Sequence, residues 1–141
     1  MINRRLTTTL ARPLAPFAAL ALLGVCAVHL LDGPHSVQDQ AYLGVLELLL
    51  AVACVPLAVL LLIEPIRATW DVALALNLLA LLVFVTSRTV GLPGSTDDIG
   101  NWSPLLGVLN MVAEGSVIGI AALALATTPR ADRHPLTRNS A

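Results

Sequence analysis

The chain has 141 residues, of which 57% are hydrophobic and only 12% are charged, and its mean hydropathy is +0.83. This leaves too little polar surface to cover a water-soluble globule, so a lipid bilayer is the environment that the composition fits. The formal net charge is -1, and the basic residues do not cluster outside the two ends of the chain. Nucleic acid is therefore not expected as a partner.

Four long apolar runs predict an all-α integral membrane four-helix bundle. The expected spans cover about residues 13–31, 41–63, 70–88 and 104–128, and about 20 apolar residues suffice for a helix to cross the hydrocarbon core. Pro56 lies inside the second run and should kink that helix. This division makes residues 1–12 an N-terminal tail, residues 32–40 an outer loop and residues 129–141 a disordered tail.

The distribution of arginine predicts that both chain ends are cytoplasmic. All eight basic residues are arginines, and a four-span arrangement places seven of them on one side and Arg88 alone on the other. Because arginine concentrates on the cytoplasmic side, we expect an N-in/C-in, multi-pass protein of a bacterial plasma membrane. A cleaved signal peptide after Arg4 and Arg5 is the alternative, but the apolar run is long and lacks a clean small-residue cleavage site.

Small and polar residues recur at helical spacing, which predicts one inward face on each span. Charged groups cost at least ~2.5 kcal/mol in hydrocarbon, and small residues let helices approach closely. The expected inward faces are Ala15, Ala19, Leu22, Cys26 and His29; Gly44, Glu47, Ala51, Cys54 and Ala58; Ala73, Asn77, Ala80, Phe84 and Ser87; and Gly107, Asn110, Glu114, Val117, Ala121 and Ala124. The two cysteines are expected to be free thiols.

Two layers of polar residues follow from a rise of ~1.5 Å per residue. His29, Glu47, Arg88 and Asn110 fall in the outer layer, which predicts an ion pair between Arg88 and Glu47 flanked by the other two. These residues either fix the order of the helices or form a site for a cation, a lipid headgroup, a small anion or a proton. A metal would require His29 with Glu47, with or without His35, and these residues lack metal-motif spacing, so no metal and no cofactor are expected.

The deeper layer contains Asn77 and Glu114, for which the sequence predicts a mutual hydrogen bond. On a neighbouring face of the last span, Gly115 and Gly119 form a pair of small residues four apart. Such pairs favour close contact with another helix. We therefore expect the lipid bilayer as one partner, and either a second copy of the chain or a larger membrane complex as another.

The loop at residues 87–104, SRTVGLPGSTDDIGNWSP, is rich in glycine and proline and predicts repeated turns. Asp97, Asp98 and Asn101 either contribute to cation binding or belong to a solvated loop that caps the last helix. Trp102 of this loop and Trp70 are expected near opposite membrane interfaces, where indole rings are favoured.

Four features together resemble a set of small bacterial membrane proteins with four predicted spans. They are His29, the segment Tyr42-Leu43-Gly44, the segment Arg88-Thr89-Val90-Gly91-Leu92-Pro93-Gly94, and Glu114. The resemblance covers the chain between His29 and Glu114. It implies the four-span topology and no particular activity.

No nucleophile, base and orienting group occur at a recognisable spacing, so the sequence gives no support for an enzyme. We expect an accessory or assembly protein of the membrane. The first alternative is a small transporter or an ion- or proton-binding protein that uses the outer polar cluster. The second alternative is a membrane redox or metal-binding protein.

Overall fold

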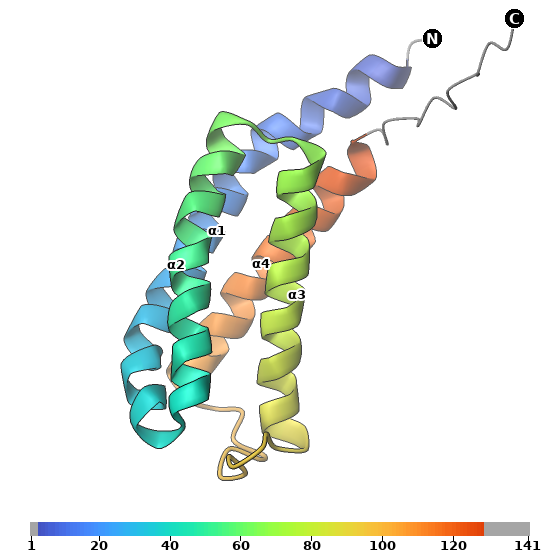
Figure 1. Ribbon diagram of the computed structural model, residues 1–141. Coiled ribbons are helices and arrows are strands. Elements are labelled where there is room, and N and C mark those ends of the chain that lie inside the picture. The colour runs from blue at the N-terminus through green and yellow to red at the C-terminus, as the bar shows by residue number, and fades with distance from the viewer. Residues whose placement is uncertain (1–2, 129–141) are drawn as a thin grey trace, which may run out of the picture.

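A computed structural model describes residues 3–128 as four antiparallel helices joined by short connections. The helices are α1 (Asn3–Asp39), α2 (Ala41–Ile63), α3 (Arg67–Thr89) and α4 (Leu105–Thr127). The start of α1 and the end of α4 lie at one end of the bundle, here called the terminal end, and the connection at residues 90–104 lies at the other, the loop end (Figure 1). All four helices are long and apolar enough to cross a membrane, so the all-α four-helix fold is confirmed.

The first helix is longer than the sequence suggested. Residues 32–40 were expected to form an outer loop, and this is wrong, because α1 continues through Pro34 to Asp39 and only Gln40 separates it from α2. At its other end α1 begins at Asn3, so helix also extends into the expected N-terminal tail. The expected C-terminal tail at residues 129–141 lies outside the described residues.

Close contact with α2 explains why α1 continues past a glycine and a proline. Gly33 lies against the side chain of Leu48, so that a Cβ added to this glycine would come 2.9 Å from Leu48 Cδ2. A Cβ added to Gly44 would overlap the backbone of Val37. The two glycines let the end of α1 and the start of α2 touch almost backbone to backbone, and this tertiary contact holds the additional helical turns.

The helices follow one another around the bundle in the order α2, α1, α4, α3. α1 packs along α2 and α4, and α4 also packs along α3. By contrast, α2 and α3 meet at few points, although only residues 64–66 connect them. The bundle is therefore incomplete on the side between α2 and α3, which is the side facing the reader in Figure 1.

The inward faces agree with the spacing of small and polar residues. The buried residues of α4 are the six expected ones, Gly107, Asn110, Glu114, Val117, Ala121 and Ala124. The five expected residues of α1 are buried as well. Glu47 of α2 and Ala80 and Phe84 of α3 are only half-buried, and all three lie where α2 and α3 separate.

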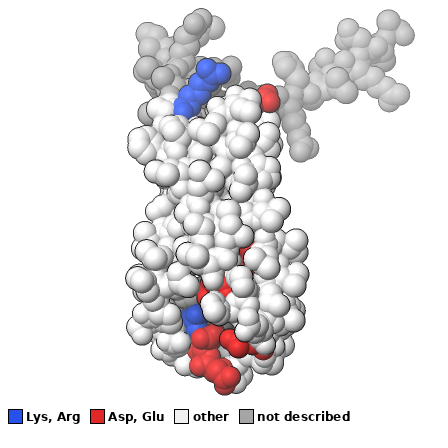
Figure 2. Space-filling view, turned by 90° about the vertical axis from the view of Figure 1, so that its left-hand side faces the viewer, with Lys and Arg blue, Asp and Glu red and all other residues white. Residues whose placement is uncertain are grey.

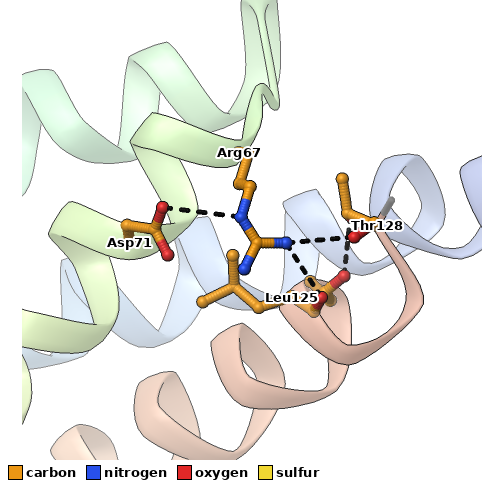
Figure 3. A network of polar contacts seen from close by, with 5 residues as sticks. Arg67, Asp71, Leu125 and Thr128 are labelled. Carbon is orange, nitrogen blue, oxygen red and sulfur yellow. Dashed lines mark hydrogen bonds and ion pairs between the residues drawn. The ribbon is translucent and has the colours of Figure 1, made fainter. Parts of the chain in front are cut away.

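An arginine joins α3 to α4 at the terminal end (Figure 3). Nη1 of Arg67 donates to the carbonyl oxygens of Leu125, at 3.3 Å, and Thr128, at 3.0 Å, while its Nε lies 3.8 Å from the Asp71 carboxylate. The last carbonyls of a helix lack intrahelical partners, and a cation there also complements the helix dipole. Trp70, which is expected near a membrane interface, lies one turn into α3 at this end and is fully buried.

Candidate binding cleft at the loop end

Residues 90–104 form a compact connection, here called the strap. Gly91, Gly94 and Gly100 have φ angles of 82°, 75° and 81°, a conformation that other residues rarely adopt. Leu92 and Ser95 exchange two backbone hydrogen bonds of 2.9 and 2.8 Å. The glycines therefore give the strap a defined path of tight turns.

Hydrogen bonds attach the strap to the opposite side of the bundle. The Tyr42 hydroxyl at the start of α2 donates to the Pro93 carbonyl at 2.8 Å, and the Gln40 side-chain amide donates to the Gly94 carbonyl. The strap thus runs from the end of α3 to the corner between α1 and α2. It bridges the loop end at the place where α2 and α3 do not pack against each other.

Arg88 at the end of α3 forms an ion pair with Asp98 of the strap. Its guanidinium also lies 5.0 Å from the centre of the Phe84 ring, which in turn meets the Trp102 ring edge to face at 6.3 Å. The predicted ion pair between Arg88 and Glu47 is wrong. The strap folds back over α3 and supplies Arg88 with a nearer carboxylate than the one on α2.

The deeper polar layer is paired differently from the prediction. Nε2 of His29 lies 3.2 Å from Oε1 of Glu114, and both side chains are buried. The Asn77 side chain donates to the Ala73 carbonyl of its own helix at 2.9 Å, so the predicted hydrogen bond between Asn77 and Glu114 is also wrong.

The length of α1 accounts for this difference. His29 precedes the end of α1 by ten residues, which places it ~15 Å from that end. Glu114 follows the start of α4 by nine residues, or ~14 Å. The two residues therefore lie at the same depth, whereas a first span ending at Leu31 would have placed His29 near the surface.

A cleft of about 860 Å³ opens at the loop end between α2 and α3. All four helices and the strap contribute to its walls. Figure 2 shows that acidic side chains gather at this end of the molecule around a basic one, whereas the middle of the bundle presents an uncharged surface. A volume of this size is typical of sites for small organic ligands.

The cleft is polar at its mouth and apolar along its length. The mouth has four carboxylates and one guanidinium, from Asp32 and Asp39 of α1, Glu47 of α2, Asp98 of the strap, and Arg88. The apolar part is lined by Leu46, Leu49, Leu50 and Ala53 of α2 and by Leu76, Leu79, Ala80 and Val83 of α3. Because its arginine is already paired with one of the acids, the mouth has an excess of negative charge.

Two side chains of the cleft have acceptor atoms that no described residue satisfies. Asn110 of α4 is only 5% exposed, and its Oδ1 has no hydrogen-bond partner in residues 3–128. Oε2 of Glu47 is likewise buried and without a hydrogen-bond partner in that part of the chain. A buried acceptor without a partner costs about 1–3 kcal/mol, so these atoms are expected to meet a ligand or water.

The four residues of the predicted outer cluster, His29, Glu47, Arg88 and Asn110, all line this cleft. Of the strap residues that the sequence singled out, Asp98 lines the cleft and Asp97 is exposed. The side-chain amide nitrogen of Asn101 lies 3.5 Å from Oδ1 of Asp98. Trp102 contacts Phe84 at the mouth.

Three further lining residues, Asp32, His35 and Asp39, had been assigned to a loop, and only His35 had been considered for a site, as a possible metal ligand. Their spacing of three and four residues is that of one helix face. Continuing the helical period past Pro34 would have found them.

Cys26 and Cys54 are buried free thiols. Among the described residues, no three His, Cys, Asp or Glu side chains are grouped closely enough to hold a metal ion. The chain matches no protein-family model, no curated protein and no solved structure in the three comparisons made. The resemblance to small bacterial four-span proteins therefore stays a prediction.

Proposed function

We propose that this chain is a multi-pass protein of a bacterial plasma membrane that binds a cationic ligand in the loop-end cleft, as a small transporter or cation-binding protein. The orientation is inferred from arginine. Arg67 lies at the terminal end, and Arg88 is at the loop end. Cytoplasmic enrichment of arginine then places the terminal end inside and the cleft outside.

The observation that carries the proposal is the unsatisfied polar wall of the cleft. His29 and Glu114 contact each other at 3.2 Å, as expected of polar side chains that fix helix order. Asn110 and Glu47 line the cleft, and each has a buried acceptor atom without a hydrogen-bond partner in residues 3–128. Acceptor oxygens carry partial negative charge, and together with the excess carboxylates they favour a ligand that carries positive charge.

A small organic cation tests this proposal. The full chain is purified in a nonionic maltoside, and binding of radiolabelled benzyltrimethylammonium is measured by equilibrium dialysis. Glu47→Gln removes the central carboxylate while preserving its shape. Interactions with a charged group contribute about 1.5–3 kcal/mol, so binding should weaken about tenfold to a hundredfold.

Asp97→Asn is the matched control, because Asp97 is an exposed acid of the strap and does not line the cleft. Saturable binding that falls in Glu47→Gln and not in Asp97→Asn supports the proposal. Equal binding by all three proteins, or no saturable binding by the unaltered chain, rejects it.

The accessory or assembly role expected from the sequence is a second candidate, supported by one face of α4. Gly115 and Gly119 are exposed, and a Cβ added to either would meet no atom within 4 Å. Two small residues four apart suit contact with a helix of another chain. Cross-linking and co-purification from native membranes test this role. Gly115→Leu should abolish the association, whereas an unchanged partner set would argue against it.

A further inference from the structure

Building on the cation-binding function proposed above, we propose that the ligand is a single-chain amphiphile with an ammonium head and an alkyl tail. Its head lies among the carboxylates at the mouth of the cleft. Its tail lies between α2 and α3, which it enters sideways from the outer leaflet of the bilayer.

The cleft continues well beyond its polar mouth. Glu47 is six residues, or ~9 Å, from the start of α2, and Ala53 is twelve residues, or ~18 Å. On α3, Ala80 is eight residues, or ~12 Å, from Arg88. Beyond Glu47 the two facing walls consist of leucine, valine and alanine side chains. A compact cation would leave this apolar part empty, whereas an alkyl chain fills it.

The route into the cleft passes between α2 and α3. The strap crosses the loop end and is held there by the hydrogen bonds from Tyr42 to Pro93 and from Gln40 to Gly94. Behind the cleft, α1 packs against α2, and α4 packs against both α1 and α3. The side between α2 and α3 has few contacts to close it. In a bilayer that side faces lipid, so an amphiphile can slide in with its head at the interface and its tail in the membrane.

The charges at the mouth of the cleft favour a cationic head. Asp32, Asp39 and Glu47 surround the mouth without a described arginine or lysine paired to them, while Arg88 is paired with Asp98. A phosphate in the head would have to separate Arg88 from Asp98 and approach three other acids. A head with net positive charge meets an excess of carboxylates and leaves the pair of Arg88 with Asp98 in place.

The test compares two ammonium ions that differ in their tails, benzyltrimethylammonium and dodecyltrimethylammonium, with dodecylphosphocholine as a zwitterionic third ligand. Ala80→Phe fills the apolar part of the cleft below Glu47. Ala75→Phe is its matched control, because Ala75 is exposed on the same helix and does not line the cleft. Binding is measured by equilibrium dialysis of the full chain in maltoside micelles, which carry no choline headgroup that would compete.

Each methylene excluded from an apolar site lowers binding roughly fourfold. Ala80→Phe should therefore weaken dodecyltrimethylammonium more than tenfold and leave benzyltrimethylammonium unchanged, and Ala75→Phe should change neither. Dodecylphosphocholine should bind at least tenfold more weakly than dodecyltrimethylammonium to the unaltered chain. Retained binding of benzyltrimethylammonium shows that a variant is folded. If Ala80→Phe loses both ammonium ions, Ala53→Leu in the opposite wall decides by the same criterion.

Equal binding of dodecyltrimethylammonium to Ala80→Phe and Ala75→Phe would overturn the tail site. The cation site would then still stand, provided that benzyltrimethylammonium depends on Glu47. Binding of dodecylphosphocholine as tight as that of the cation would overturn the assignment of the head. If neither ammonium ion depends on Glu47, the proposed function fails together with this inference.

Discussion

Removal of His29 should destabilise the bundle by leaving a buried acid without a partner. In the folded chain Glu114 has a fully buried side chain, and one of its oxygens lies 3.2 Å from His29 Nε2. Its other oxygen has no hydrogen-bond partner among the described residues. His29→Leu therefore leaves both oxygens unsatisfied. Removing one partner of a buried pair lowers the free energy of unfolding by about 3–5 kcal/mol. The lower value applies here because polar side chains of the unfolded helices form other hydrogen bonds in micelles.

We predict a loss of about 3 kcal/mol in the free energy of unfolding for His29→Leu. Adding Glu114→Met to His29→Leu should restore most of the loss, because the acid is then gone and the site is apolar. His35→Leu, at an exposed histidine of the same helix, should change stability by less than about 0.5 kcal/mol. Unfolding by sodium dodecyl sulfate, followed by helical circular dichroism, measures all three. If His29→Leu were as stable as the unaltered chain, or if the double variant were the least stable, the pairing would be refuted.

Three further predictions concern contacts that hold the helices and the strap together. Gly44→Ala should lower the free energy of unfolding by about 3 kcal/mol in the same assay, because the added Cβ overlaps the backbone of Val37. Gly24→Ala is its control and should be tolerated, because the added Cβ comes no closer than 3.8 Å to Ala113. Arg67→Met should cost about 1–2 kcal/mol and speed amide hydrogen exchange in the last turn of α4, and unchanged exchange there would show that the arginine is not needed. Tyr42→Phe should speed exchange in the strap with less than about 1 kcal/mol of global destabilisation, and a protected strap would contradict its role as an anchor.

Much of the fold is predictable because lipid imposes a simple rule on the sequence. Each run of about 20 apolar residues becomes a helix, and the few polar side chains turn inward. The spacing of Gly107, Asn110 and Glu114 thereby identified the buried face of α4. The end of α1 was not predictable in this way, since Gly33 and Pro34 suggest a turn locally. Their helical conformation depends on a tertiary contact with α2, and a local sequence pattern does not reveal such a contact.

The pairing of the polar residues was harder to predict than their clustering at one end of the bundle. The depth of a residue in the membrane is counted from the end of its helix. Because the predicted end of α1 was wrong, the predicted depth of His29 differed from that of Glu114. The partner of Arg88 depended on the path of the strap, which glycine turns at positive φ determine. The cleft itself results from the absence of close packing between α2 and α3. The sequences of these two helices do not show that the helices fail to pack against each other.

The central claim is that a polar, water-accessible cleft lies at the outer end of the bundle between α2 and α3. Cysteine labelling in intact cells tests it most directly, with Cys26 and Cys54 replaced by alanine and a membrane-impermeant maleimide as reagent. Glu47→Cys, inside the cleft, should be labelled from outside. Val45→Cys lies nearer the start of α2 but is exposed on its lipid-facing side, so it should not be labelled. Glu64→Cys, in the connection to α3, should react only after the cells are opened. Equal labelling of Glu47→Cys and Val45→Cys, or labelling of Glu64→Cys in intact cells, would contradict the account.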